Sequence, residues 1–293
     1  MLRHWFSLLR DELQVFIQPH RIELLRLKGV RGLRPQWVDA KTISFKREMS
    51  TLTLPDDWPR VIKQLSLELK EDRWQASTAS VVLSSHFMRY AVVPWMSEIS
   101  TTDEWQAYLN HHFVMAYGDV VKSWNLHMDE PQYKNTTFAS AMPNTLHTAL
   151  NDTFSKAKLP LTTIQPYFIQ AVNQLIEDHT TISNGWLIVI ENEHLTMSLI
   201  EEGEWCMVKS VPLAANIEAQ IDMLIEREIM LKRIKVNDKV ERRHGYAIFI
   251  HWPNSSEVKT LNIKSHRVIN VVSKQQVNNR QAKQQPSIQW MTR

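Results

Sequence analysis

The sequence predicts an α/β protein with two lobes, and two observations support this prediction. The chain has 293 residues, 43% of them hydrophobic, and a single hydrophobic core usually divides into two at about this length. Short apolar runs bounded by turn residues, which are typical of strands, alternate with longer segments whose apolar residues recur at helical spacing. Eleven tryptophans and nine phenylalanines indicate that most of the chain is folded.

Residues 1–20 are expected to form an N-terminal amphipathic helix. Trp5, Phe6 and Leu9 begin a series of apolar residues at near-helical spacing. Acidic residues interrupt the series and no small-residue cleavage site follows, so a signal peptide is not indicated. Two interpretations remain open: the helix packs on the body of the protein, or it docks to a partner or a membrane surface through Trp5, Phe6 and Leu9.

Residues 21–180 are predicted to form the first lobe. The first two strands are expected to be joined by a turn at Gly29–Gly32, and the polar step Ser84–Ser85–His86 is expected to separate the strands of a pair. In chain order, the lobe is expected to contain strands at 21–27 and 36–45, a helix at 61–69, a strand pair at 80–84 and 87–94, a helix from 101 to about 116, a strand pair at 122–127 and 136–142, a helix at 144–156, a strand at 161–164 and a helix at 166–176.

The helix beginning near residue 101 has the clearest sequence signal in the chain. Thr101 and Glu104 have the spacing of a capping box, in which the two side chains accept hydrogen bonds from backbone N–H groups left unpaired at a helix N-terminus. Trp105, Leu109 and Phe113 then fall on one face of the helix.

Residues 181–273 are predicted to form the second lobe. Three strands in succession, at 185–190, 195–200 and 205–211, indicate an antiparallel meander, followed by a long helix at about 216–235. A strand at 246–251 and one or two more within 258–272 complete it. Residues 274–293 contain Lys274, Arg280, Lys283 and Arg293 and no acidic residue, which predicts a disordered basic tail. This tail is interpreted as a solvated linker or as a contact with anionic lipid or nucleic acid.

Four segments of the sequence, in order, carry a resemblance to a known family: QPHRIELLRL, SVVLSSHFMRYAVVPW, TTIQPYFIQAV and NGWLIVIENEHLTMSLIEEGEWCMVKSVPL. Their order and pattern cover most of residues 18–251. They resemble actin-like assembly proteins, namely PilM of type IV pili and the cytoplasmic half of GspL of type II secretion systems. The resemblance implies a two-lobed actin-like (ribonuclease H-like) fold with mixed sheets flanked by helices. It also implies a partner, a short cytoplasmic peptide of an inner-membrane protein bound in a groove of one lobe.

An actin-like ATPase binds the phosphates of ATP with backbone N–H groups from two glycine-rich hairpin turns, together with acidic residues that hold Mg²⁺. The expected first turn contains Gly29 and Gly32, but the strand before it offers only one carboxylate, Glu23. The expected second turn has no glycine and begins at Glu191, a residue interpreted either as an ordinary turn carboxylate or as a displaced Mg²⁺ ligand. The third expected contact, residues 252–255, also lacks glycine. The sequence therefore predicts a degenerate nucleotide site, with no cofactor or with residual ATP and Mg²⁺.

Other chemistries have little support in the sequence. The twelve histidines show no spacing that would place two imidazoles on one helical face for a metal ion. Cys206 is the single cysteine, so neither an intrachain disulfide nor a cysteine-based zinc site is expected. His86, Arg89 and Trp95 are candidates for partner contacts, with internal packing as the alternative.

These observations predict a non-catalytic cytoplasmic scaffold at the inner face of the bacterial inner membrane. Its expected partner is an inner-membrane protein of a type IV pilus or type II secretion-like assembly platform. Two alternatives remain open: an ATP-binding actin-like protein with weak or no hydrolysis, and a nucleic-acid-binding module that uses the basic tail. The excess of three basic residues, 34 against 31, is too small to favour nucleic acid by itself.

Overall fold

The structure, a computed structural model, describes residues 9–30, 36–45, 58–178, 182–233, 246–252, 261, 263 and 268–271. The chain divides into two compact units, each built from three segments: residues 1–89, 117–126 and 141–167 make the first unit, and residues 90–116, 127–140 and 168–293 make the second. The predicted boundary near residue 180 does not separate these units, because residues 90–116, 127–140 and 168–180 of the predicted first lobe belong to the second unit.

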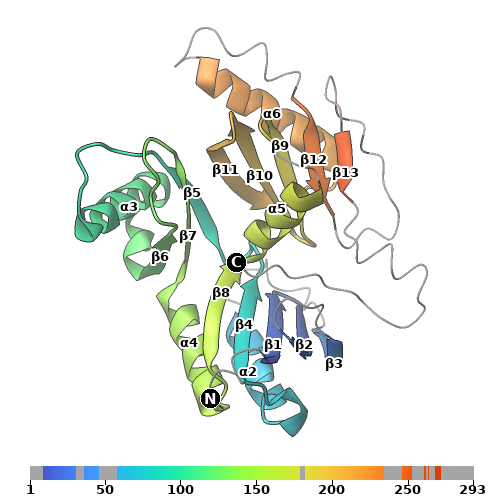
Figure 1. The fold of residues 1–293 in the computed structure, drawn as a ribbon. Coiled ribbons are helices and arrows are strands. Elements are labelled where there is room, and N and C mark those ends of the chain that lie inside the picture. Colours follow the sequence, from blue (N-terminus) through green and yellow to red (C-terminus); the bar gives the residue numbers. More distant parts are fainter. Residues whose placement is uncertain are drawn as a thin grey trace. The chain divides into compact units, whose positions relative to one another are not determined.

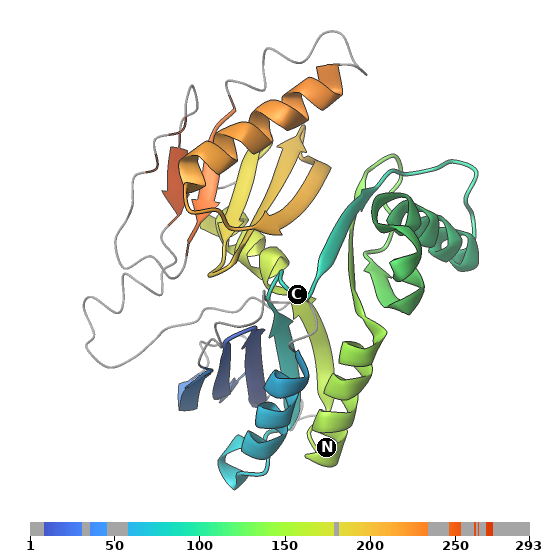
Figure 2. The same cartoon turned by 180° about the vertical axis from the view of Figure 1, so that it is seen from behind.

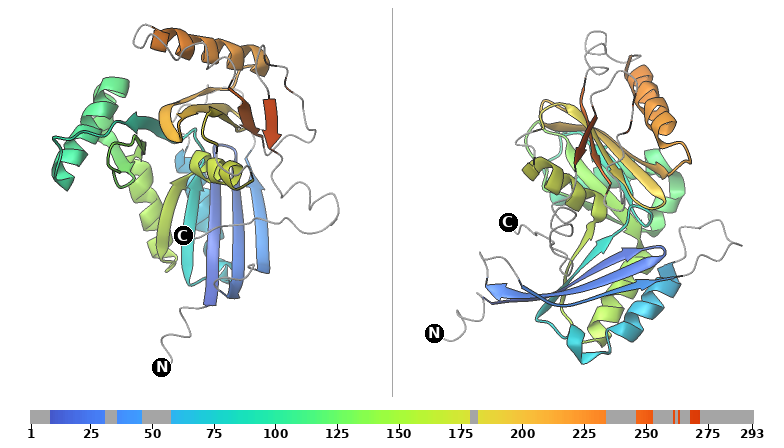
Figure 3. Two further views of the ribbon diagram at one scale, coloured as in Figure 1. Left: turned by 45° about the horizontal axis from the view of Figure 1, so that its top comes forward. Right: turned by 90° about the vertical axis from the view of Figure 1, so that its right-hand side faces the viewer.

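The first unit contains a five-stranded sheet in the order β3-β2-β1-β4-β8 (Figure 1). Strands β1 and β2, and β2 and β3, are antiparallel, whereas β4 is parallel to β1 and to β8. The left-hand view of Figure 3 shows the strands of this sheet side by side, and the right-hand view shows the sheet near its edge. Its strands are β1 (Leu9–Gln18), β2 (Arg21–Val30), β3 (Gln36–Ser44), β4 (Thr78–Leu83) and β8 (Leu161–Pro166).

The predicted N-terminal helix is wrong over the residues that the structure describes, because Leu9–Gln18 is strand β1. Leu13, Val15 and Ile17 alternate along the strand and are buried, and both edges of β1 are paired, with β2 and with β4. The apolar residues of this segment fit both a period of 3.6 and a period of 2. Pairing with both neighbouring strands gives the backbone N–H and C=O groups of this buried segment hydrogen-bond partners. A lone terminal helix on the surface would not need partners from neighbouring strands. Trp5 and Phe6 lie outside the described residues.

An acidic residue of β1 anchors the neighbouring elements. The carboxylate of Asp11 accepts two hydrogen bonds from the Arg26 guanidinium on β2, at 3.1 and 3.0 Å. The same guanidinium donates to the carbonyl oxygen of Arg73 at 2.8 Å, in the short helix η1 (Asp72–Trp74). Two parallel N–H···O bonds to one carboxylate fix geometry better than a single contact. Asp11 therefore positions β1 and β2 against η1.

Two helices cover one face of the first sheet, as Figure 2 shows. Helix α2 (Trp58–Glu68) buries Val61, Ile62 and Leu65, and helix α4 (Asn144–Lys156) buries Leu146, Leu150 and Phe154. The two helices also pack against each other. Both follow the apolar spacing expected from the sequence, and these predictions are confirmed.

A second, smaller sheet has the order β5-β7-β6, with β5 (Arg89–Val93), β6 (Trp124–Met128) and β7 (Thr137–Pro143). The predicted pairing of the strands near residues 122–127 and 136–142 is confirmed. The predicted pairing of 80–84 with 87–94 is wrong, because β4 belongs to the five-stranded sheet and β5 to this one. The turn between them lets the chain pass from one sheet to the other.

Helix α3 (Thr102–Tyr117) lies beside the small sheet (Figure 1), and it begins at the predicted capping box. The Glu104 carboxylate accepts hydrogen bonds from the backbone N–H groups of Ser100 and Thr101, both at 2.9 Å. The Thr101 hydroxyl in turn accepts one from the Glu104 N–H at 3.3 Å. These bonds, first from Ser100 and then from Thr101, lower the pKa of Glu104 from 4.5 to about 2.

This pKa predicts that the start of α3 weakens in acid. The folded pKa lies below the unfolded one, so the capping contribution is complete above about pH 4.5 and is lost as the pH falls through about 2. We expect Glu104→Gln to speed hydrogen exchange of the first-turn amides at neutral pH, and a carbon-13 NMR titration of the wild-type carboxyl to show the low pKa. Asp103→Asn is the matched control, because it neutralises an adjacent first-turn carboxylate without touching these bonds. Equal effects of the two substitutions would contradict the capping role.

The second unit contains a five-stranded sheet in the order β11-β10-β9-β12-β13. The predicted meander is confirmed, since β9, β10 and β11 pair antiparallel in succession, and β12 is parallel to β9 and to β13. Helix α6 packs on one face and α5 lies on the other (Figures 1 and 2). The elements are α5 (Tyr167–Asp178), β9 (Gly185–Ile190), β10 (His194–Glu201), β11 (Glu204–Pro212), α6 (Ile217–Arg233), β12 (Ile248–His251) and β13 (Val268–Val271).

An aromatic cluster joins four elements of the structure. The ring of Phe168 on α5 lies 5.6 Å from that of Tyr90 on β5, 5.9 Å from Phe138 on β7 and 6.2 Å from Trp205 on β11. The hydroxyl of Thr136 donates to the Trp205 carbonyl at 2.6 Å. These contacts explain why residues 90–116 and 127–140 group with the second sheet rather than the first.

Candidate functional site

The strand order of the first sheet reverses between β1 and β4. These two parallel strands have their carboxyl ends at the same edge of the sheet. From β1 the chain continues to β2 and β3 on one side, whereas β4 and β8 lie on the other. Ile17 and Leu83 face each other at the ends of these strands, and the Ser84 N–H donates to the Ile17 carbonyl at 2.9 Å. Ligands of open α/β sheets bind outside the carboxyl ends of strands at such a switch point.

The turn between β1 and β2 lies at this edge. It consists of Gln18, Pro19, His20 and Arg21, and its position is held from the side by the Phe45 N–H, which donates to the His20 carbonyl at 2.8 Å. Proline offers no N–H group. The turn therefore lacks a continuous row of backbone donors, and the Arg21 guanidinium beside it pairs with the Glu23 carboxylate at 2.8 Å.

The segment after β4 forms a buried polar turn beside it. Ser84, Ser85 and His86 are each at most 4% exposed, and the Ser84 hydroxyl accepts a hydrogen bond from the His86 N–H at 3.2 Å. The Arg89 guanidinium donates to the carbonyls of His86 and Met88, at 3.2 and 2.7 Å. The structure thus brings the predicted contact residues His86 and Arg89 together, but it uses the Arg89 guanidinium to hold the turn.

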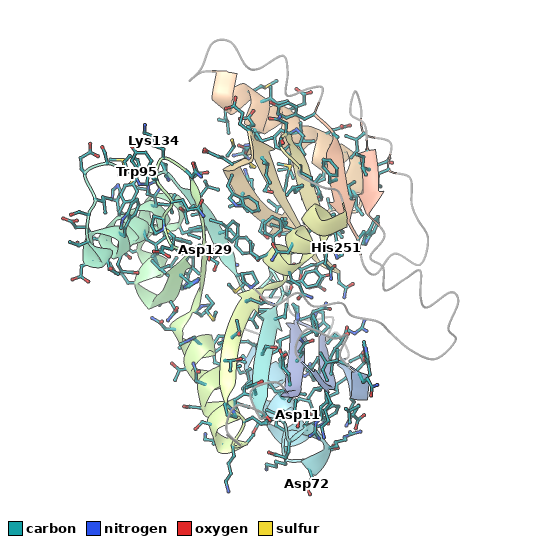
Figure 4. All side chains as sticks on the ribbon, in the orientation of Figure 1. Asp11, Asp72, Trp95, Asp129, Lys134 and His251 are labelled. Atoms are coloured by element: carbon teal, nitrogen blue, oxygen red, sulfur yellow. The ribbon has the colours of Figure 1, made fainter. Side chains whose placement is uncertain are left out.

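The second sheet has the same kind of edge, between β9 and β12. The hairpin from β9 to β10 is closed by the Glu191 N–H, which donates to the His194 carbonyl at 2.8 Å. Strand β12 ends at His251, opposite Val189 of β9, and Figure 4 shows His251 at that end of the sheet. Glu191 is 4% exposed and His251 is 2% exposed.

Each unit therefore places two histidines at the carboxyl ends of its central parallel strands. His20 and His194 lie at hairpin turns, while His86 and His251 lie at or just after the ends of β4 and β12. Histidine spacing along helices does not reveal this arrangement. The available signal was that each of these histidines follows an apolar strand run within a few residues, as in VFIQPH, VVLSSH, IVIENEH and IFIH.

The remaining predicted site residues are dispersed. Gly29 lies inside β2, opposite Arg10, and is not in a turn. The first phosphate turn is therefore predicted one strand too late along the chain, because the sequence predicts a helix where β1 lies. Leu9 begins β1, and Gly32 lies outside the described residues. Trp95 follows β5, where its ring meets the Tyr133 ring edge-on at 4.9 Å. Gly29 and Glu191 belong to different units.

No protein-family model and no curated protein matches the sequence, but solved structures match the fold. The cytoplasmic domain of Epsl, an inner-membrane component of the type II secretion system of Vibrio cholerae, has a TM-score of 0.54 at 9% identity, with 90% of each chain covered. A chain of the PilM-PilN type IV pilus biogenesis complex has 0.60 at 11%, covering 89% of this chain and 88% of the other. A Bacteroides thetaiotaomicron protein with an actin-like ATPase fold and unknown function has 0.52 at 11%, covering 91% and 92%.

The chain has the actin-like fold. Each unit of this actin-like chain contains three antiparallel strands, a helix and a further strand parallel to the first: β1-β2-β3-α2-β4 in one unit and β9-β10-β11-α6-β12 in the other. The hairpin turns that an actin-like ATPase would use for phosphate are therefore residues 18–21 and 191–194.

Neither turn fits a phosphate chain. Both lack glycine, and a side chain at each position keeps a ligand away from the backbone N–H groups. The first turn contains Pro19, and the second contains the carboxylates of Glu191 and Glu193. Among the described residues, no group of three or more His, Cys, Asp or Glu side chains could hold a metal ion. The two turns therefore lack the glycine-rich backbone donors expected of an actin-like ATPase.

Proposed function

We propose that the chain is a non-catalytic cytoplasmic scaffold that binds an inner-membrane protein of a type IV pilus or type II secretion-like assembly platform. The observation that carries the proposal is the combination of an actin-like fold with hairpin turns unsuited to phosphate. The fold similarity to the cytoplasmic domain of Epsl and to the PilM-PilN complex supports the kind of machine. None of the described helices has the length and apolar character that a membrane span requires, so the proposed membrane contact is made through a partner.

Electrostatics support the absence of ATP turnover. Two like charges 4 Å apart repel by about 4 kcal/mol at an effective dielectric constant near 20. Glu191 and Glu193 stand in the turn where an actin-like ATPase would place a phosphate group, and the turn contains no lysine or arginine. Bound phosphate would be repelled there unless a carboxylate took up a proton or a Mg²⁺ ion.

The second candidate is an ATP-binding actin-like protein with weak or no hydrolysis. The histidines at the strand ends favour it, because His20 and His86 are placed beside the switch point of the first sheet, where ligands of α/β sheets bind. Protonated imidazole can attract an anion. In this candidate, histidines would replace the missing backbone donors.

Membrane fractionation tests the proposed function. A tagged full-length chain is expressed in cells that carry a type IV pilus or type II secretion assembly platform. We expect the chain in the membrane pellet, and we expect it to move to the supernatant when the gene for the inner-membrane partner is deleted. An unchanged distribution in the deletion strain would contradict the scaffold role.

The same purified chain, heated with Mg-ATP, separates the two candidates. A ligand present at 100 times its dissociation constant stabilises a protein by about 2.7 kcal/mol, which is several degrees in a chain of this size. We expect no such shift. A rise of several degrees would favour the ATP-binding candidate.

A further inference from the structure

Helix α3 carries a row of partly exposed aromatic side chains that ends in an exposed methionine. Only Leu109 and Phe113 are buried along its 16 residues. A second row, Trp105, Tyr108, His112 and Met115, follows the spacing 3, 4, 3 and so lies on one side of the helix. We call these four residues the α3 stripe.

The α3 stripe is preassembled. The Trp105 and Tyr108 rings meet edge-on at 5.9 Å, and the Tyr108 and His112 rings do so at 4.6 Å. Met115 at the end of the row is 73% exposed. Aromatic rings held by one another lose little side-chain entropy on binding, and exposed methionine adapts its shape to a partner.

The segments of the second unit that contain α3 and follow it are acidic. In residues 90–116 and 127–140 the acidic residues are Glu98, Asp103, Glu104, Asp129 and Glu130, all exposed, and the only lysine or arginine is Lys134. Five acidic residues minus one basic residue give a net charge of −4, whereas the whole chain carries +3. The last turn of α3 contains no basic residue, so the negative end of the helix dipole also favours a cation there.

The one cation in the region is already engaged. The Lys134 ammonium lies 5.0 Å from the centre of the Tyr133 ring, which also meets the Trp95 ring, and Figure 4 shows Trp95 and Lys134 at the same end of this region. Burial, and secondarily the charge of His111, lowers the pKa of His112, so His112 is neutral near pH 7. No positive charge on a residue of the α3 stripe therefore offsets the negative charge of the nearby acidic residues.

We propose that the α3 stripe is a docking surface for a cationic amphipathic helix of a partner protein. The stripe extends ten residues along α3, about 15 Å at 1.5 Å per residue, which matches a partner helix of about three turns. Apolar side chains of that helix would pack between the rings, and its Lys or Arg residues would face the carboxylates. The proposal rests on the proposed function only in that the chain works by binding partners, and it assigns a location and a chemistry to one of them.

The test uses a 14-residue fluorescent helical peptide with leucines at i, i+3, i+4 and i+7 and lysines elsewhere, titrated against the full chain by anisotropy. A peptide with glutamate in place of lysine is the charge control. We expect only the lysine peptide to bind, with affinity that falls as salt rises because exposed charges are screened. Failure of the lysine peptide to bind, or equal binding of the glutamate peptide, would overturn the proposal.

Two matched variants locate the site. Met115→Arg adds a positive charge to the α3 stripe, and Met223→Arg makes the same change on α6, at a methionine that is 59% exposed. We expect Met115→Arg to weaken the lysine peptide about tenfold or more, since 1.4 kcal/mol of repulsion corresponds to a factor of ten. Met223→Arg should leave binding unchanged. Equal losses in both variants would mean that the peptide binds by net charge alone.

Other occupants would give other results. Peptide binding only after removal of residues 274–293 would show that the basic tail of the chain fills the stripe. A wild-type dimer that Met115→Arg dissociates would show that a second copy does. Either result would overturn the assignment to a partner protein. In the fractionation experiment, membrane association that survives Met115→Arg would contradict this docking surface but not the proposed function. Membrane association of the wild type that does not depend on the partner gene would contradict the proposed function itself.

Discussion

Replacing Val15 by proline is expected to unfold the first unit. Val15 is fully buried in the central strand β1, opposite Leu24 of β2 and Val81 of β4. Proline removes a backbone donor, and central strands exclude it. We expect a loss of more than about 3 kcal/mol, measured by urea unfolding followed by circular dichroism, with Val15→Ala giving a smaller loss by the same method.

Val38→Pro is the control for this experiment. Val38 lies on the edge strand β3, is 49% exposed, and sits where the β2–β3 register shifts, so it has no partner residue across the ladder. Edge strands and bulges accept proline, and we expect near wild-type stability. If Val15→Pro were tolerated as well as Val38→Pro, β1 would not be a central strand.

Replacing Phe168 by alanine is expected to be the largest single loss in the second unit. Its ring is fully buried and touches Tyr90, Phe138 and Trp205. Removal of a buried phenylalanine side chain destabilises a protein by about 3–5 kcal/mol. The free energy of unfolding from denaturant titration measures it. Tyr133→Ala, at a ring that is 70% exposed, should change stability far less.

A double-mutant cycle then tests the aromatic cluster itself. Phe138 and Phe168 stack at 5.9 Å, and such a pair contributes about 0.5–1.5 kcal/mol beyond burial of its area. We expect a coupling energy of that size between Phe138→Ala and Phe168→Ala. Strictly additive losses would mean that the two residues act separately.

Local signals along the sequence predicted most elements correctly. The capping box at Thr101 and Glu104 locates the start of α3 within a residue, because two side chains and three backbone groups form one local unit. The meander of β9, β10 and β11 follows from short apolar runs and tight turns. These features depend on residues close together in the chain, so one sequence is enough to predict them.

The errors concern long-range pairing. Leu13, Phe16 and Ile17 fit a helical face as well as a strand, and the choice depends on β4, some 65 residues later. That error moved the first hairpin turn from Pro19–His20 to Gly29–Gly32. Two apolar runs that are adjacent in the sequence likewise do not indicate that β4 and β5 belong to different sheets. The candidate site at the strand ends therefore required the topology, although its histidines were visible in the sequence.

Chain connectivity between the two units limits how this protein can be divided. The chain passes from one unit to the other five times, after Arg89, Ala116, Leu126, Ser140 and Tyr167. No continuous coding fragment contains either unit alone, and a C-terminal truncation at any of the first four crossings removes segments of both units. A cut in the β6–β7 loop would leave β4 and β8 on separate fragments that still pair in the first sheet. Separate functions for the two units must therefore be tested by point substitutions in the full chain, not by expressing halves.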